Sequence, residues 1–395
     1  MGSSSRSTPS PCSSRVTDLS AALAALPTPS LLLDVERARR NARRIGDRVK
    51  ALGARLRPHV KTHKCIEVGR LQVEGQFGGI TVSTLAEARA FAAHGFRDIT
   101  YAVPIEPGKF DAAISLARAG VRLAVITDDV AIPGPLAARV RASAQVLDVW
   151  VKVDCGYHRC GVDPETDALP ELVRRIGEEH AAGLRFGGLL THAGHSYHVK
   201  GRAAVAAIAS AERDVMVRAA DHLRGLGIEV PALSVGSTPT VTHVDHLRGI
   251  DEVRAGNYVF FDGTQAAIGS CGTEDCALTV LTSVVHRDRA RRHVVLDAGA
   301  IALSKDRGAT DLGDAPGYGR LLSLDGEDLG AQVTSVSQEH GTVAVEDDAL
   351  LDRLPVGARV RVLANHSCLT AAQHESYHVH DGQRVVEQWS ILRGW

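Results

Sequence analysis

The run Arg57-Pro58-His59-Val60-Lys61-Thr62-His63-Lys64 concentrates the basic side chains that are best suited to chemistry in this sequence. It completes a predicted strand over residues 56–61. Strand side chains alternate between two faces. One face is therefore predicted to carry Arg57, His59, Lys61 and His63. Positive neighbours lower the pKa of a lysine, and a neutral lysine amine can form a Schiff base. A basic strand edge that faces solvent is the alternative.

The motif Asn365-His366-Ser367-Cys368 has side chains that could bind a metal ion. It follows a predicted strand at 359–364, and residues i and i+2 of an extended chain point the same way, so His366 and Cys368 can reach one ion. One imidazole and one thiolate favour zinc. Such a pair alone more often binds nothing, because zinc sites normally use three or four protein ligands.

Two loops rich in glycine and small hydroxyl residues, 234–240 and 254–258, follow or close predicted strands. Backbone N–H groups at glycine turns, together with Ser and Thr hydroxyls, suit a phosphate dianion. Either loop alone is also typical of an ordinary turn. Their place at the ends of the last two strands of a barrel is where barrel proteins commonly bind phosphate.

Two further segments end predicted strands. Residues 155–161 read Cys-Gly-Tyr-His-Arg-Cys-Gly, which is a glycine-rich turn that presents Arg159. Its two cysteines could resemble a metal pair, but we do not assign them one. Residues 191–197 read Thr-His-Ala-Gly-His-Ser-Tyr, and two histidines and a tyrosine around a glycine are more suggestive than a single histidine, which is often a core residue.

The elements that must position these residues alternate between short apolar runs and amphipathic helical stretches. The predicted strands are 56–61, 79–83, 99–103, 122–127, 147–154, 186–192, 232–236 and 253–261. Predicted helices between them include 85–94, 109–119, 169–182 and 202–226. Eight strands alternating with helices predict a parallel α/β barrel with its chemistry at the strand C-termini. An open doubly wound sheet is the rival, but no Gly-x-Gly-x-x-Gly follows a strand.

The chain changes character from about residue 277, where Val- and Thr-rich runs are separated by Asp-Gly turns at 325–326 and 381–382. This pattern predicts a mostly antiparallel β domain. The predicted organisation is a disordered tail at 1–25, a barrel at 26–270 and a β domain at 271–395.

The composition excludes several classes of partner. The chain has 395 residues, a net charge of −1 and 7 cysteines. A near-neutral charge gives no indication of nucleic acid or a membrane surface, and no apolar run approaches the roughly 20 residues of a membrane span. An odd number of irregularly spaced cysteines indicates a reducing, cytoplasmic compartment rather than a disulfide framework.

Several separated motifs resemble one family: the octapeptide around Lys61, Ser-x-Gly-Ser-Thr-Pro at 234–239, Gly-Asn-Tyr at 256–258 and Asn-His-x-Cys at 365–368. They resemble the D-threonine aldolase and D-serine dehydratase family, a branch of the alanine-racemase-like fold-type III enzymes. The resemblance covers about residues 28–395. It implies a (β/α)8 TIM-type barrel that binds pyridoxal 5'-phosphate, followed by the β domain, with residues 28–33 pairing with that domain.

The resemblance also implies the roles of individual residues. Lys61 is the catalytic lysine that carries the cofactor. The residues expected to bind the cofactor are Lys61, His59, Arg159, His192, Gly236, Ser237, Thr238, Gly256 and Asn257. His366 and Cys368 are expected to bind the metal, with zinc as the expectation and manganese or magnesium as alternatives, because D-threonine aldolases of this family carry His-x-Asp here.

The function implied is a lyase that acts on a small D-β-hydroxy amino acid. Cys368 favours a D-serine or D-threonine dehydratase that gives a 2-oxo acid and ammonia. The alternative is a D-threonine aldolase that gives glycine and an aldehyde. A racemase and a non-catalytic cofactor-binding protein are further alternatives, and a homodimer is expected by analogy. Because the metal pair comes from the β domain and Lys61 from the barrel, the two sites are expected on separate scaffolds.

Overall fold

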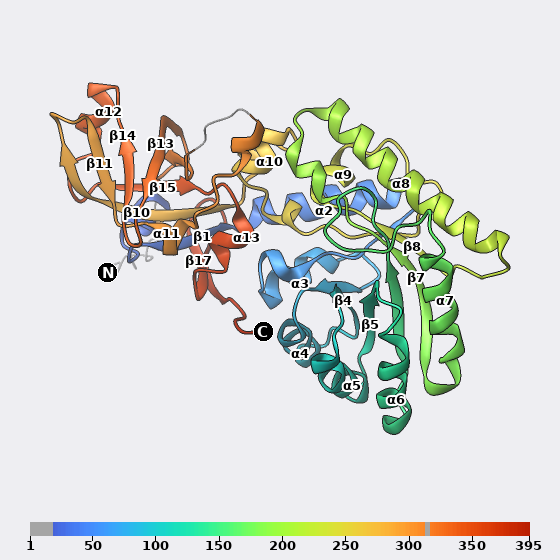
Figure 1. Cartoon of the computed structure of the whole chain (residues 1–395). Coiled ribbons are helices and arrows are strands. Elements are labelled where there is room, and N and C mark those ends of the chain that lie inside the picture. Colours follow the sequence, from blue (N-terminus) through green and yellow to red (C-terminus); the bar gives the residue numbers. More distant parts are fainter. Residues whose placement is uncertain (1–18, 313–316) are drawn as a thin grey trace, which may run out of the picture.

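The protein has two domains side by side, a barrel surrounded by helices and a β domain, shown by a computed structural model (Figure 1). The structure describes residues 19–312 and 317–395. Most of the predicted tail, residues 1–18, therefore lies outside the described residues. The prediction of a disordered tail is wrong for its last part, because residues Leu19–Ala24 form helix α1. In this helix Leu23 is buried against Leu32 and Leu281. Burial of apolar side chains stabilises this short helix.

The barrel is a sheet of eight parallel strands in the order β2-β9-β8-β7-β6-β5-β4-β3. A parallel bridge between His59 and Thr81 joins the two outer strands, and the Thr81 N–H donates to the Pro58 carbonyl oxygen at 2.8 Å, so the sheet closes. Buried Val149, Val151 and other branched residues contribute to one continuous core. The fold class predicted from alternating strands and helices is confirmed.

The barrel elements have the following bounds. The strands are β2 (Arg55–Leu56), β3 (Ile80–Val82), β4 (Asp98–Pro104), β5 (Arg122–Thr127), β6 (Leu147–Lys152), β7 (Leu184–Leu190), β8 (Leu233–Val235) and β9 (Glu252–Val253). The helices are α2 (Val35–Ala51), α3 (Ile66–Val73), α4 (Leu85–Ala93), α5 (Phe110–Arg118), α6 (Pro133–Ser143), α7 (Ala168–Glu178), α8 (Arg202–Gly225), α9 (Thr238–His243) and α10 (Gly263–Ile268). Within the described residues, no helix is long and apolar enough to cross a membrane.

The β domain is built on a second sheet in the order β11-β14-β13-β12-β15-β10-β1-β16-β17. Its strands are β1 (Ser30–Asp34), β10 (Leu278–Asp288), β11 (His293–Leu296), β12 (Arg320–Leu322), β13 (Asp328–Val336), β14 (Gly341–Ala344), β15 (Arg359–Leu363), β16 (Ser376–His380) and β17 (Val385–Ser390). Its short helices are α11 (Ala300–Leu303), α12 (Asp348–Arg353) and α13 (Ser367–Ala371). Strand β1 precedes the barrel in the chain, yet it pairs antiparallel with β10 and parallel with β16.

Two of the predicted barrel strands are much shorter than expected. The strand predicted at 56–61 ends as β2 at Leu56, and Val60–Thr62 form a 3-10 turn. Pro58 has no N–H to donate to a strand ladder, which explains the early end. The strand predicted at 253–261 is β9 plus a 3-10 turn at Asn257–Val259. Both segments pass into turns at the barrel rim, so their side chains do not alternate as strand residues would.

Candidate active site

A cavity of about 670 Å³ lies at the C-terminal ends of the barrel strands and reaches the β domain. Every residue that the sequence suggested for the cofactor or metal contributes to its lining. These residues are Lys61, His59, Arg159, His192, Gly236, Ser237, Thr238, Gly256, Asn257, His366 and Cys368. Ser83 and Tyr197 also line the cavity, whereas His195 does not. The structure therefore brings together groups that lie up to about 300 positions apart in the sequence.

Lys61 lies on the 3-10 turn Val60–Thr62, directly after the His59 N-cap. Burial lowers the pKa of Lys61, and the nearby Arg159 lowers it further, against an opposing effect of Cys368. A lowered pKa increases the fraction of neutral amine, which is the nucleophilic form. The structure therefore gives Lys61 the property that the sequence suggested, but mainly through burial and not through a row of bases.

The predicted shared face of alternating basic residues is wrong. Arg57 is buried away from the cavity, where Nε donates to Glu252 Oε2 at 2.7 Å and the guanidinium also pairs with Asp98. His63 is fully buried, with Nε2 2.9 Å from Oε1 of Gln72. The turn after β2 changes the direction of the chain. Arg57 and His63 therefore point into the barrel packing and not into the cavity.

Two histidines at the cavity wall are held neutral. Burial lowers the pKa of His59 and His192 well below the ordinary value, and the positive charge of Lys61 lowers both further. His192 Nδ1 is 3.0 Å from the Gly236 carbonyl oxygen. Because that carbonyl can only accept, Nδ1 carries the proton and Nε2 is free to accept.

The two glycine-containing loops meet the cavity beside the lysine turn. Ser237 caps α9, and its side chain and that of Thr240 form a reciprocal capping box. At Gly256 an added Cβ would lie 2.5 Å from the His59 carbonyl oxygen and 2.9 Å from Thr62 Oγ1. Glycine is thus required for the close approach of this loop to the lysine turn.

Positive charge dominates the cavity wall. Lys152, Arg159 and Arg254 supply cationic groups, against the carboxylates of Asp262 and Asp306. Backbone N–H groups of the loop at 256–257 donate to no carbonyl or side chain within the described part of the chain. Unused donors and an excess of cations fit the phosphate of pyridoxal phosphate, and a neutral Lys61 amine fits its aldehyde.

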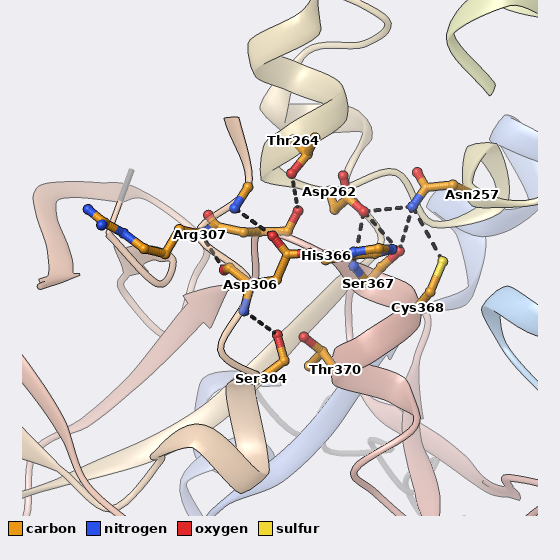
Figure 2. A network of polar contacts seen from close by, with 12 residues as sticks. Asn257, Asp262, Thr264, Ser304, Asp306, Arg307, His366, Ser367, Cys368 and Thr370 are labelled. Atoms are coloured by element: carbon orange, nitrogen blue, oxygen red, sulfur yellow. Dashed lines mark hydrogen bonds and ion pairs between the residues drawn. The ribbon is translucent and has the colours of Figure 1, made fainter. Parts of the chain in front are cut away.

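His366 and Cys368 lie at the β-domain side of the cavity, around the start of α13 (Figure 2). Burial alone would lower the pKa of His366, but the charges of Cys368 and the bonded Asp306 outweigh it and raise the pKa to about 11. Burial would raise the pKa of Cys368, but His366 outweighs it and lowers that pKa. The thiolate, which is the form that binds metals, is therefore favoured.

A hydrogen-bond network joins the metal motif to the barrel. Asn257 Nδ2 donates to Asp262 Oδ2 at 2.6 Å and to Ser367 Oγ at 3.0 Å, and lies 3.8 Å from Cys368 Sγ (Figure 2). Cys368 Sγ is also 3.4 Å from Oγ1 of Thr62, the residue after Lys61. The metal motif and Lys61 do come from separate domains, as expected, but the phosphate-loop residue Asn257 contacts the metal motif directly, so the two scaffolds meet at one cavity.

Sequence reasoning missed several polar residues of the cavity: Lys152, Arg254, Asp262 and Asp306. Burial and the nearby Arg254 lower the pKa of Lys152 to about 8. Lys152 could have been predicted as a site residue, because it ends the mostly apolar strand β6 and a buried lysine is unusual. Asp262 and Asp306 stand in ordinary-looking turns, and nothing in their local sequence distinguishes them.

The two cysteines of the glycine-rich turn at 155–161 differ in their position relative to the cavity. Cys160 lines it, whereas Cys155 is buried, and burial raises the pKa of the Cys155 thiol to about 11. Among the residues described, the one group of three or more potential ligands with atoms within 4.8 Å of one another is His286, Asp288 and His293. These residues belong to the β10–β11 hairpin and do not line the cavity.

Family models match both domains of the chain. The "Alanine racemase, N-terminal domain" matches residues 33–263, and the "Putative serine dehydratase domain" matches residues 277–380. The chain is 41% identical to D-threo-3-hydroxyaspartate dehydratase of Delftia sp. (strain HT23), over 94% of this chain and 99% of the relative. It is 33% identical to D-serine dehydratase of Dictyostelium discoideum, over 94% and 98%. D-threonine aldolase of Arthrobacter sp is 30% identical, over 94% and 92%.

Solved structures give the same relationship. D-threo-3-hydroxyaspartate dehydratase from Delftia sp. HT23 superposes with a TM-score of 0.90 at 41% identity, covering 95% of this chain and 100% of the other. A cysteine-to-alanine variant of that dehydratase is described as being in the metal-free form. The alanine racemase from Bacillus anthracis superposes with a TM-score of 0.67 at 13% identity, covering 92% and 98%, which shows the fold alone.

Two matching domains, a full-length relative at 41% identity and the shared cavity lead to one assignment. The chain belongs to the alanine-racemase-like, fold-type III family of pyridoxal-phosphate-dependent lyases that includes D-serine dehydratases and D-threonine aldolases.

Proposed function

We propose that this enzyme is a metal-dependent dehydratase of D-β-hydroxy amino acids that releases a 2-oxo acid and ammonia. The observation that carries the proposal is the position of Cys368 and His366 in the same cavity as Lys61, with Cys368 Sγ 3.4 Å from Thr62 Oγ1. The similarity to a D-threo-3-hydroxyaspartate dehydratase and a D-serine dehydratase supports it. We take D-serine, D-threonine and D-threo-3-hydroxyaspartate as the substrates to test.

The cavity residues divide into three groups in this proposal. Lys61 would hold pyridoxal phosphate covalently, and the loops at 236–238 and 256–257 would hold its phosphate. His366 and Cys368 would hold a divalent metal, for which one imidazole and one thiolate favour zinc over manganese or magnesium. When bound, the cofactor ring withdraws electrons from Cα and the metal polarises the β-hydroxyl group.

Lys61 is the proposed base at Cα. Its Nζ is neutral in a larger fraction than an ordinary lysine, because burial and Arg159 lower its pKa. A neutral Nζ can accept the α-proton, which prepares the neighbouring carbon for loss of the hydroxyl group. His59 and His192 remain neutral at the same pH and add no competing positive charge. Arg159 keeps its charge throughout, as guanidinium groups do.

A D-3-hydroxy amino acid aldolase is the second candidate. The observation that favours it is the 30% identity to D-threonine aldolase of Arthrobacter sp over nearly the whole chain. In that reaction the hydroxyl proton leaves and the Cα–Cβ bond breaks, which gives glycine and an aldehyde. The thiolate of Cys368 favours the dehydratase, because family aldolases carry the harder ligand aspartate at this place.

Metal removal tests the proposed role of the pair. We expect a chelator, or Cys368→Ala, to abolish ammonia release while the visible absorbance of the lysine-bound cofactor changes little. Zinc should restore the chelated enzyme but not Cys368→Ala. Cys368→Asp should prefer manganese to zinc. The matched control is Cys160→Ala, which removes another cavity thiol and should leave the zinc stoichiometry unchanged. Full ammonia release by the chelated enzyme would contradict the proposal.

The domain boundaries and the assembly are further proposals. We infer a barrel unit at 26–270 and a β domain at 271–395, supported by the change from parallel to mostly antiparallel sheet. Strand β1 is the exception, because it precedes the barrel yet pairs within the second sheet.

A homodimer is proposed by analogy with fold-type III enzymes. Light scattering of the purified enzyme would test it.

A further inference from the structure

Asp306 is an acidic residue in direct contact with His366 of the proposed metal pair. Its Oδ2 is 2.7 Å from Nδ1 of His366, and the carboxylate can only accept this hydrogen bond (Figure 2). Asp306, His366 and Cys368 do not form a group whose ligand atoms all lie within 4.8 Å of one another. Asp306 is therefore not placed to share one ion with both other residues.

The loop that carries Asp306 is firmly held. Gly308 N–H donates to Asp306 Oδ1 at 2.7 Å, and the Asp306 N–H donates to Ser304 Oγ at 3.2 Å. Asn365 Nδ2 donates to the Asp306 carbonyl oxygen at 3.2 Å. Since Asn365 directly precedes His366, the loop and the metal motif fix each other. The carboxylate therefore has a defined position with respect to the imidazole.

A hydrogen bond at one ring nitrogen decides what the other nitrogen can do. An accepting carboxylate at Nδ1 keeps the proton there, so the lone pair of a neutral His366 is on Nε2. Nδ1 of His366 is engaged by Asp306, so Nε2 is the nitrogen left to bind an ion, and His366 and Cys368 line the same cavity. Nε2 of His366 and Sγ of Cys368 are therefore the two donor atoms that this motif offers to an ion.

We propose that Asp306 is a positioning residue of the metal site. By accepting the Nδ1–H of His366, it selects the tautomer and fixes the ring orientation in which Nε2 binds the ion together with Cys368. The inference rests on the proposed metal role of that pair. It adds a residue of the β-domain loop at 304–308 that the sequence did not single out.

Zinc affinity of the purified, cofactor-loaded enzyme tests the proposal. The dissociation constant is measured by competition with a chromophoric chelator at one fixed pH, which requires no turnover. Loss of such an outer hydrogen bond typically weakens metal binding about 10–100-fold, so we expect this loss in Asp306→Ala. Asp306→Asn keeps the size and an acceptor oxygen but lacks the charge, so its affinity should fall between Asp306→Ala and the unaltered enzyme.

Three controls make the result decisive. Asp347→Asn applies the same substitution at the N-cap of α12, away from the cavity, and should not change zinc affinity. His366→Ala and Cys368→Ala define the affinity without a ligand. Thermal unfolding and the visible absorbance of the bound cofactor check that each variant is folded, and the isosteric Asp306→Asn keeps the test available if Asp306→Ala does not fold.

Each contrary outcome has a distinct meaning. Unchanged zinc affinity in both Asp306 variants, with a loss in His366→Ala, would overturn the positioning role and leave the proposed function intact. Loss in Asp306→Asn as complete as in His366→Ala would make Asp306 a direct ligand, and so would also overturn it. Unchanged affinity in His366→Ala and Cys368→Ala would remove the metal site itself, and the proposed function with it.

Discussion

At the scale of the residue, two lysines of one octapeptide have different environments. Lys61 lines the cavity, and burial lowers its pKa. Lys64 instead forms an ion pair with Glu87, whose carboxylate is buried. One lysine is thus available for covalent chemistry, and the other neutralises a buried acid.

Lysine replacement should separate these roles. Lys61→Ala should lose both turnover and the visible absorbance of the lysine-bound cofactor. Lys64→Ala should retain the absorbance but lower the free energy of unfolding by on the order of 1–3 kcal/mol, because Glu87 loses its partner while Lys64 is still partly exposed. Absorbance spectra and urea unfolding of both variants provide the measurements. The reverse pattern of absorbance would show that the wrong lysine has been assigned.

The identity of the cavity residues was largely readable from sequence, because motifs such as 234–239 and 365–368 carry their own chemical signature. Their partners were not readable. Asp262 accepts from the Ser367 backbone N–H at 2.9 Å, across 105 positions of sequence. Asp306 meets His366 across 60 positions. Such pairings depend on how the two domains pack against each other, and the local sequence does not indicate that packing.

At the scale of the element, the turn that carries Lys61 shows why the predicted strand was too long. Apolar and basic residues alternate from Leu56 to Lys61, so the pattern has the period of a strand. Pro58 and the cap at His59 end the strand, and α13 packs against the resulting 3-10 turn. Tertiary contacts therefore decide where the pattern stops, whereas longer periodic elements such as α8 were predicted within one residue of their bounds.

His63, at the end of this turn, makes the stability of the enzyme depend on pH. Burial lowers the pKa of His63 to about 4, below the ordinary 6.5. Between these values the unfolded chain binds a proton that the folded chain excludes, so folding stability falls as pH decreases, by about 1 kcal/mol per pH unit. Above pH 6.5 this contribution to the slope vanishes.

Urea unfolding of the unaltered enzyme and of His63→Gln, at several values between pH 7 and pH 5, measures this contribution. The variant should show a shallower loss of stability on acidification. His380 also has a pKa lowered to about 4, mainly by burial, so the unaltered enzyme and the variant both keep its share of the slope. Identical slopes would show that His63 is not the group that resists protonation.

At the scale of the whole molecule, the β domain holds the lysine turn in place. Tyr377 of β16 is fully buried, and its hydroxyl donates to the His63 carbonyl oxygen at 2.7 Å. The Leu392 N–H, near the C-terminus, donates to the Lys64 carbonyl oxygen at 2.6 Å. Together with the hydrogen bonds of Asn257 to Asp262 and Ser367, these contacts show that both domains form the cavity.

Removal of the Tyr377 hydroxyl should therefore affect the barrel. Tyr377→Phe leaves the buried His63 carbonyl without this donor, which costs about 1–3 kcal/mol of folding free energy. We expect faster loss of cofactor on dialysis together with a lower unfolding temperature. Tyr318→Phe removes a hydroxyl from the same domain outside this contact and serves as the control. Equal behaviour of the two variants would show that the β domain does not support the turn.

The central claim is that the cavity dehydrates a D-β-hydroxy amino acid, and product analysis tests it most directly. The zinc-loaded enzyme is incubated with D-serine, D-threonine and D-threo-3-hydroxyaspartate, and the 2-oxo acid, ammonia, glycine and aldehyde are each quantified. We predict a 2-oxo acid and ammonia in equal amounts from at least one substrate, with no glycine. Glycine and an aldehyde in equal amounts would contradict the account and identify an aldolase.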